Sequence, residues 1–346
     1  SKTGVDWTKR WNGALYLAGV FEDTAYIENT MLISKGEADL FVSKYDMDGN
    51  LVWVKQAGGT QNDFLSGMDV DDDGNIVVAG NYESSISFDT LVHNTNNLFG
   101  ESYVAKYSNS GDVLWAKTVV GNNTNLTTDI AYDNNGGYLI TGFFSGNYNL
   151  GGSSISSSTQ SYDILIGKLD KNGNTVWLKK AGSIAEDAAQ AICADKDGNA
   201  FITGYFTRTA YFDSNSIDYL DYNDIFIAKY APDGSNLWAR AGKGSQLDGG
   251  FGITTDDEGN VYGTGMFMFT LDFDGWQRTS NNGRDIYIVS YSPSGNVRWL
   301  TSAGGVNTDA GLDLTVKPSG NIALCGYYLN TCRFGDIEID YAEYND

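Results

Sequence analysis

The sequence is poor in the residues on which most catalytic and metal sites depend. It contains one histidine, His93, in the stretch LVHNTNN, and that stretch has no counterpart elsewhere in the 346 residues. A single histidine excludes a multi-histidine metal site, and it leaves no plausible partner set for a histidine-based catalytic triad. We therefore expect His93 to be a solvated loop residue.

The three cysteines also lack the pattern of a functional site. Cys193, Cys325 and Cys332 are odd in number and show no metal-ligand spacing. Cys193 and Cys325 fall inside strand patterns, where a free cysteine usually behaves as a small buried apolar residue. We expect this role for both, and a Cys325–Cys332 disulfide is the alternative.

Long apolar runs and positive charge are scarce as well. No run approaches the roughly 20 apolar residues that a membrane helix needs, so we expect no membrane insertion. The 44 acidic and 22 basic residues give a net charge of -22, which repels phosphate backbones and makes nucleic acid an unexpected partner. The opening residues, SKTGVDW, do not have the shape of a signal peptide, so we expect that any export signal was removed or never included.

What the chain has in abundance is repetition. Five tryptophans recur at nearly equal intervals along the sequence: Trp53, Trp115, Trp177, Trp238 and Trp299. A glycine follows each of them at one constant distance: Gly80, Gly142, Gly204, Gly265 and Gly326. An acid precedes each of them, also at one constant distance: Asp39, Glu101, Asp163, Asp224 and Asp285. Only the segment from the glycine to the next acid varies in length, and variable spacing is typical of a surface loop.

Each repeat has the pattern of four short strands. Segments such as NIVVAGNY and DVLWAKTV are rich in β-branched and aromatic residues, and Asp/Asn/Ser followed by Gly separates them. Four antiparallel strands repeated around a ring make a β-propeller, so the sequence predicts an all-β fold of this kind. The recurring tryptophan would lie on the outermost strand and wedge against the neighbouring blade, a structural role.

The two ends of the chain depart from this spacing. Trp7 and Gly19 are much closer together than the tryptophan and glycine of every other repeat, and Asp346 falls on the recurring acid position. We interpret residues 1–346 as a single six-bladed β-propeller domain of four-stranded antiparallel blades, with six repeats of about 61 residues, closed by the N-terminal strand that carries Trp7. The inner strand of blade one and the third strand of blade six would be missing. A longer protein with a seventh blade is the alternative.

The repeat that begins at Asp224, DIFIAKYAPDGSNLWARAG followed by DDEGNVYGTG and DFD, resembles the SBBP-type β-propeller repeat. The resemblance lies in the order of these landmarks and covers nearly the whole chain. Such repeats are similar to those of exported and surface-displayed bacterial proteins. The resemblance implies an extracellular or cell-surface location, and it implies no common catalytic residues.

Acidic residues offer two candidate cation sites. The stretch DVDDDGN, Asp69 to Asn75, begins like a calcium loop, but the position of the bidentate acid is Gly80, so we interpret it as a hairpin turn. A better candidate is the residue 10 positions after each repeat tryptophan, which opens the innermost strand: Asp63, Asn125, Asp187, Asp248 and Asp309. These side chains would converge at one mouth of the channel and could hold Ca²⁺. The alternative is that each anchors backbone amides of a loop.

Trp276 is the remaining candidate for ligand binding. It lies off the repeat spacing, in the variable segment DFDGWQRTSNNGRD, among residues that suit sugar stacking or a protein hot spot. Packing of this tryptophan onto its own blade is the alternative. A catalytic pair of carboxylates for glycoside hydrolysis is also conceivable in so acidic a chain, but no pair is singled out by departing from the repeat.

Near-uniform repeats without a unique catalytic constellation predict a protein that is not an enzyme. We expect a secreted or cell-surface propeller that serves as a binding or assembly module, adhesin-like or for protein–protein contact. Its partner would be another envelope or extracellular protein, or a surface glycan. The alternative is a calcium-dependent carbohydrate-binding or carbohydrate-active protein that uses one channel mouth, with Ca²⁺ as its only cofactor.

Overall fold

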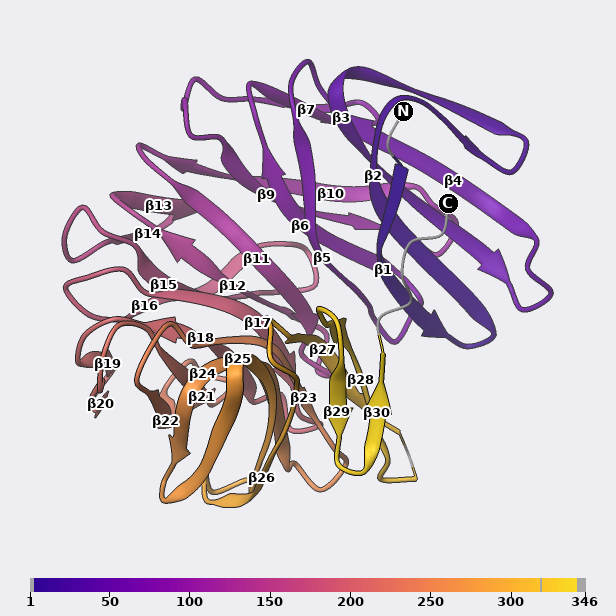
Figure 1. The fold of residues 1–346 in the computed structure, drawn as a ribbon. Coiled ribbons are helices and arrows are strands. Elements are labelled where there is room, and N and C mark those ends of the chain that lie inside the picture. The colour runs from indigo at the N-terminus through magenta and orange to yellow at the C-terminus, as the bar shows by residue number, and fades with distance from the viewer. Residues whose placement is uncertain (1–2, 318, 341–346) are drawn as a thin grey trace. The chain divides into compact units, whose positions relative to one another are not determined.

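The computed structural model describes residues 3–317 and 319–340, and for residues 3–6 it describes the backbone alone. These residues form 30 strands, β1 to β30, all in antiparallel pairs where the pairing is given (Figure 1). None of the described segments is a helix long and apolar enough to cross a bilayer. The prediction of an all-β fold is confirmed.

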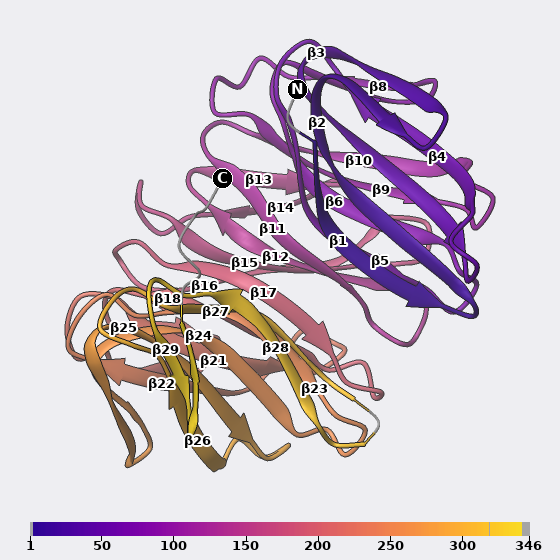
Figure 2. The same cartoon turned by 45° about the vertical axis from the view of Figure 1, so that its right-hand side comes forward.

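The described residues form two compact units. Residues up to 160 together with 165–180 form the first unit, and residues 161–164 together with those from 181 onward form the second (Figures 1 and 2). Each unit is built from the predicted repeats.

Repeats 1 to 3 each contain four antiparallel strands in sequence order. Repeat 1 consists of β1 (Thr3–Trp11), β2 (Ala14–Ile27), β3 (Thr30–Asp46) and β4 (Leu51–Gly58). Repeat 2 consists of β5 (Asp63–Val70), β6 (Ile76–Tyr82), β9 (Glu101–Tyr107) and β10 (Val113–Gly121). Repeat 3 consists of β11 (Asn125–Tyr132), β12 (Tyr138–Phe144), β15 (Asp163–Leu169) and β16 (Thr175–Ala181).

Repeats 4 and 5 have the same order, and repeat 6 is shorter in the described residues. Repeat 4 consists of β17 (Ala188–Ala194), β18 (Ala200–Phe206), β21 (Asp224–Tyr230) and β22 (Asn236–Gly244). Repeat 5 consists of β23 (Gly249–Thr255), β24 (Val261–Phe273), β25 (Trp276–Tyr291) and β26 (Val297–Ala303). Repeat 6 has two such strands, β27 (Ala310–Val316) and β28 (Ile322–Tyr327).

The variable segment of each repeat is a hairpin rather than a loop. The separate hairpins are β7 (Ser85–Phe88) with β8 (Leu91–Asn94), β13 (Asn147–Leu150) with β14 (Ser153–Ser156), β19 (Ala210–Phe212) with β20 (Asn215–Ile217), and β29 (Cys332–Phe334) with β30 (Ile337–Ile339). The hairpin pairs with the fourth strand of the preceding repeat, as Phe88 does with Ala57 and Leu150 with Val119. The expectation of a surface loop was wrong, because this pairing satisfies backbone groups that an outer sheet edge would leave open.

The repeat tryptophans contact the next repeat. The indole N–H groups of Trp53, Trp115 and Trp238 donate to the carbonyl oxygens of Asn109, Lys171 and Pro293, at 3.1, 3.1 and 3.2 Å. Each acceptor lies in the turn between the third and fourth strands of the following repeat. Trp238 is buried, whereas the other four repeat tryptophans are half-buried.

The N-terminal strand does not have the place that the sequence suggested. β1 pairs along β2, with Val5 opposite Gly19 and a bulge before Trp7. Leu65 of β5 is opposite Gly80 with the same bulge, so β1 is the first strand of repeat 1 and its inner strand is present. The closure of the last blade by Trp7 was therefore wrong, because the short spacing from Trp7 to Gly19 is that of a tight hairpin through Asn12 and Gly13, both at positive φ. Asp346 lies outside the described residues.

The cysteines and the acidic turn also have clear outcomes. Cys193, Cys325 and Cys332 are all free, so the alternative disulfide is not formed, and Cys325 is exposed rather than buried. In the stretch DVDDDGN, Asp71 accepts hydrogen bonds from the backbone N–H groups of Asp73 and Asn75, at 3.0 and 2.9 Å. This is the chemistry of a capped turn, which confirms the interpretation as a hairpin turn.

Candidate functional site

The residues predicted to form a channel-mouth ring are buried, and each lies beside the acid 24 positions earlier in the chain. The pairs are Asp39 with Asp63, Glu101 with Asn125, Asp163 with Asp187, Asp224 with Asp248, and Asp285 with Asp309. The second member accepts backbone hydrogen bonds: Asp309 binds the N–H groups of Gly305 at 2.7 Å and Leu329 at 3.0 Å. Each pair therefore ties the end of a fourth strand to the following repeat.

Glycines leave the space in which these acids meet. A Cβ added at Gly58 would lie 2.2 Å from Cγ of Asp39, and one added at Gly244 would lie 1.5 Å from Oδ2 of Asp248. Both distances are far below a van der Waals contact. The glycine at the end of the fourth strand is thus required by the close approach of the acids.

Burial shifts the pKa values of these acids upward. It raises the pKa of Asp63 and of Asp248 to about 8, and the neighbouring acid of each pair acts in the same direction. It raises the pKa of Asp187, Asp224 and Asp285 to about 6. In the described part of the chain, Oδ1 of Asp39 and of Asp63 lack a hydrogen-bond donor.

The pairs do not group further into a larger acidic site. Within residues 3–317 and 319–340, no three or more His, Cys, Asp or Glu side chains lie together in an arrangement that could hold a metal ion. The hydrogen bonds of Asp63, Asp187, Asp248 and Asp309 fit the alternative role of anchoring backbone amides. Cation binding by this set stays a prediction.

One pair departs from the others in both of its members. At Glu101 and Asn125 the first acid is longer by one methylene and the second is an amide, whose Nδ2 lies 3.5 Å from Oε2 of Glu101. Oε1 of Glu101 accepts hydrogen bonds from the N–H of Gly121 at 3.0 Å and from Nδ2 of Asn97 at 3.3 Å. An amide here supplies the donor that a second carboxylate cannot.

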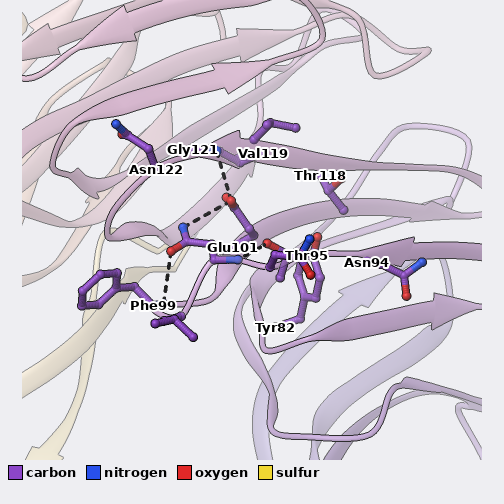
Figure 3. A pocket seen from close by; sticks show the side chains of 13 residues that line it. Tyr82, Asn94, Thr95, Phe99, Glu101, Thr118, Val119, Gly121 and Asn122 are labelled. Carbon is purple, nitrogen blue, oxygen red and sulfur yellow. Dashed lines mark hydrogen bonds between the residues drawn. The ribbon is translucent and has the colours of Figure 1, made fainter.

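A pocket of about 520 Å³ opens beside this modified pair (Figure 3). Its walls come from the segment after β8, from β10 and from Tyr82 at the end of β6. The lining residues are Tyr82, Asn94, Thr95, Asn96, Asn97, Leu98, Phe99, Glu101, Thr118, Val119, Val120, Gly121 and Asn122. Uncharged amide and hydroxyl groups dominate the lining, and Glu101 is its one ionisable carboxyl group.

The rim of the pocket is apolar and exposed. Leu98 and Phe99 are 96% and 61% exposed, although they are joined to a segment that Asn97 holds in place. Nδ2 of Asn97 donates to the carbonyl oxygen of Asn123 at 2.7 Å, and its Oδ1 accepts from the N–H of Phe99 at 3.2 Å. Exposed apolar side chains on a fixed segment are typical of a binding surface.

His93 lies at the edge of the same pocket and is not the solvated loop residue that the sequence suggested. It is on β8, half-buried, and its Nδ1 is 3.4 Å from Oγ1 of Thr118. Thr118 in turn hydrogen-bonds the buried hydroxyl of Tyr82. Burial and the nearby Lys117 lower the pKa of His93, so its imidazole is neutral at pH 7.

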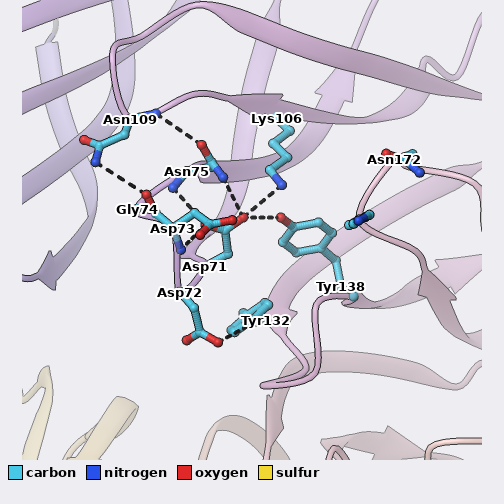
Figure 4. A network of polar contacts seen from close by, with 12 residues as sticks. Asp71, Asp72, Asp73, Gly74, Asn75, Lys106, Asn109, Tyr132, Tyr138 and Asn172 are labelled. Carbon is cyan, nitrogen blue, oxygen red and sulfur yellow. Dashed lines mark hydrogen bonds and ion pairs between the residues drawn. The ribbon is translucent and has the colours of Figure 1, made fainter.

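The acidic turn of repeat 2 forms a separate network with a structural role (Figure 4). Oδ2 of Asp71 forms a salt bridge of 2.9 Å with Lys106 and accepts hydrogen bonds from Tyr138 at 2.8 Å and Asn75 at 3.0 Å. Asp71 and Lys106 are both buried, and the Lys106 ammonium also lies over the Tyr138 ring. Because every polar group here has a partner, the network offers no open position to a ligand.

Trp276 lies at the tip of the β24–β25 hairpin and is 44% exposed. Asp274 and Gly275, both at positive φ, form the turn that precedes it. The same hairpin contributes Asp272 and Asp274 to a polar pocket of about 690 Å³ in the second unit, together with Arg240 and Lys243, but Trp276 does not line that pocket. Ligand binding by Trp276 stays a prediction.

Sequence reasoning missed the repeat 2 pocket, although its signals were present. The only histidine, the only glutamate among the recurring acids and the only asparagine among the strand-opening residues lie close together in the chain, between His93 and Asn125. Each departure was judged alone, and none was decisive. Their convergence in one repeat was the informative feature.

Comparisons with known proteins give a coarse placement. No family model matches the chain. It is 27% identical over 265 residues to an uncharacterized WD repeat-containing protein of Acanthamoeba polyphaga mimivirus, which covers 64% of this chain and 19% of that protein. It is 23% identical over 321 residues to the regulatory protein FlaEY of Caulobacter vibrioides, which covers 80% of this chain and 33% of that protein. The chain spans a fifth to a third of these relatives.

Among solved structures, the chain has a distant likeness to rhamnogalacturonan lyase YesW, with a TM-score of 0.24 and 11% identity over 84% of this chain and 74% of that one. A rhamnogalacturonan lyase of Bacillus licheniformis has a TM-score of 0.23 and 10% identity, with the same coverage. TM-scores of this size do not indicate a shared fold. The WD repeat relative and the antiparallel sheets together point to a β-propeller repeat protein.

Proposed function

We propose that this protein is a non-enzymatic binding module of the β-propeller type, which recognises a segment of another protein through the repeat 2 pocket. One observation carries the proposal. The recurring acids are engaged within the repeats, whereas the departures from the repeat, His93, Glu101 and Asn125, surround a pocket with neutral polar walls and an exposed apolar rim. The name of the WD repeat relative supports a role in protein interaction generally.

The chemistry of the pocket favours a neutral peptide segment over a charged ligand. Asn94, Asn96, Asn97 and Asn122 can donate to and accept from backbone amides, and Leu98 and Phe99 can pack on apolar side chains. The single carboxyl group, Glu101, already accepts hydrogen bonds from Gly121 and Asn97, so it is not free to act as a general acid or base.

The finer features of the proposal come from the repeat and its resemblance to the SBBP type. We propose a ring of six blades, export to the cell surface or beyond, and a partner among envelope or extracellular proteins. The repeat period and the net charge of -22 support these features.

Site-specific photo-crosslinking tests the proposed function. A benzophenone amino acid placed at Phe99 should crosslink to a discrete partner protein on the producing cells. The same group at Val176, which is 55% exposed in a different repeat, is the matched control. Equal labelling from both positions would contradict the proposal, and so would turnover of a glycan or peptide panel by the purified chain.

A surface glycan is the second candidate ligand, because the four asparagines of the pocket also suit sugar hydroxyls. Glycan-array binding that is lost in Asn97→Ala and survives EDTA would favour a glycan in this pocket. Binding lost on EDTA treatment and on substitution of Asp63 or Asp248 would instead favour the calcium-dependent alternative.

A further inference from the structure

The second strand of repeat 6 has an open edge. In repeats 1 to 5 the second strand lies between the first and third strands of its sheet, as β18 lies between β17 and β21. In the described residues β28 pairs with β27 alone, in the same register, with Gly326 opposite Gly311 and the bulge that follows it. The backbone groups along the other edge of β28 are therefore available to a further strand.

Burial shows how unusual this edge is. In β6, β12, β18 and the first seven residues of β24, six of seven residues are buried. None of the six residues of β28 is buried, and Tyr327 is 45% exposed. The contrast is sharpest at Cys325, which is exposed, whereas the residues at the same position in repeats 2 to 5 are fully buried: Ala79, Thr141, Thr203 and Thr264.

We propose that the open edge of β28 is a docking site for an antiparallel β-strand with the sequence of the repeat's own third strand, carried on a second polypeptide. The third strands of this chain define the chemistry of that partner. They read DLFVSKY, ESYVAKY, DILIGKL, DIFIAKY and DIYIVSY: an acid, three mostly apolar residues, a small residue, then Lys or Ser and a large apolar residue. A strand of this kind adds main-chain hydrogen bonds and covers the apolar residues of β28.

The register of the added strand follows from the other repeats. In repeat 4, Gly204 is opposite Phe226 and Thr203 is opposite Ile227. The same register on β28 places the residue two positions after the acid opposite Gly326. It places the residue three positions after the acid opposite Cys325.

A second copy of this chain is a poorer donor than another repeat-bearing polypeptide. The third strands β3, β9, β15, β21 and β25 each lie between two hydrogen-bonded neighbours in their own sheets. A second copy would have to break one of these pairings before it could donate the strand. A partner whose repeat hairpin is unpaired carries no such cost.

Alkylation of Cys325 tests the proposal on the intact wild-type chain. The probe is a synthetic peptide of residues 224–244, which contains the third and fourth strands of repeat 4. At a peptide concentration about ten times its dissociation constant, the rate of Cys325 alkylation should fall about tenfold, because only the free fraction reacts. The half-buried Cys193 of β17 is the internal control, and its rate should not change. A peptide with Ile227→Pro should not protect, because it lacks a backbone donor in the strand.

Disulfide trapping tests the register. A peptide with Ile227→Cys should trap Cys325 much faster than a peptide with Phe226→Cys, because a shift of one residue places the side chain on the other face. Equal trapping by the two peptides, or no protection by the wild-type peptide, would overturn the proposal. Protection of Cys325 that depends on the concentration of the chain alone, with a dimer in sedimentation, would overturn it in favour of a second copy.

Discussion

The amide of Asn125 faces the carboxyl group of Glu101, with Nδ2 3.5 Å from Oε2, at a position where the other four pairs bring two aspartates together. The chain thus contains its own comparison between an acid–acid and an acid–amide pair. An amide donates a hydrogen bond to the neighbouring carboxylate, whereas an aspartate can do so only when it is protonated. This difference predicts a pH dependence of stability that substitution can transfer between repeats.

We expect Asp63→Asn to make the protein less sensitive to alkaline pH. The pKa of Asp63 is raised to about 8 in the folded state, against about 3.9 in an unfolded chain, and each pKa unit is worth about 1.4 kcal/mol. The folded state therefore holds a proton that the unfolded state releases. Stability from this group is complete below about pH 4 and is lost as the pH rises through about 8.

Urea unfolding of the wild type and Asp63→Asn at pH 5, 6.5 and 8 measures this effect. The free energy of unfolding of the variant should exceed that of the wild type by an amount that grows with pH. Asn125→Asp is the reciprocal control, and it should add a loss of stability over the same range. Parallel curves for wild type and Asp63→Asn would contradict the shared role of the pair.

We expect Asp71→Ala to destabilise the protein by about 3–5 kcal/mol, because it leaves the buried ammonium of Lys106 without its ion-pair partner. Asp170→Ala is the matched control, since Asp170 caps an equivalent turn but is exposed. That control should cost about 0.5–1.5 kcal/mol, the worth of an ordinary hydrogen bond. Chemical denaturation compares the two, and equal losses would show that the turn matters and the buried ion pair does not.

The repeat tryptophans should differ in their contributions according to their burial. Trp238 is 6% exposed and stacks on Tyr291, with ring centroids 5.9 Å apart. We expect Trp238→Ala to cost about 3–5 kcal/mol and Trp115→Ala to cost less, because Trp115 is only half-buried. Trp238→Phe isolates the indole N–H bond to Pro293, which is worth about 0.5–1.5 kcal/mol. Thermal melts of the three variants rank these losses, and an equal loss for both alanine variants would mean that burial does not set the cost.

The sequence was sufficient for the strands and the repeat, because apolar alternation and Asp-Gly turns depend on neighbours in the chain. It was misleading at Trp7, where a tryptophan on a first strand was taken for one of the fourth-strand series. The Asn12-Gly13 turn beside it was the better guide, since this dipeptide favours a two-residue hairpin whatever the flanking residues.

The pocket depended on information that the sequence expresses only weakly. The pairing of Glu101 with Asn125 joins two distant positions in the chain, and it becomes visible once the third strand of one repeat meets the first strand of the next. The contact of His93 with Thr118 depends on a hairpin that pairs with the preceding repeat, and the variable length of that segment suggested a loop instead. Both are long-range contacts that local periodicity does not encode.

We expect Asn97→Ala to loosen the rim of the pocket without unfolding the protein. Asn97 links the segment before β9 to Asn123, to Glu101 and to the backbone of Phe99, so its loss removes three hydrogen bonds from an exposed segment. Chymotrypsin cleaves after large apolar residues, and Leu98 and Phe99 should become its first sites of attack. Limited digestion should therefore be several times faster in the variant, while the melting temperature should change little, because local opening of a surface segment need not involve the core. Asn94→Ala, on the same segment but with an exposed side chain, should leave the digestion rate unchanged. If the melting temperature falls in step with faster digestion, the segment is part of the cooperative core, and it cannot then serve as the fixed but separately adjustable rim that the proposed binding role requires.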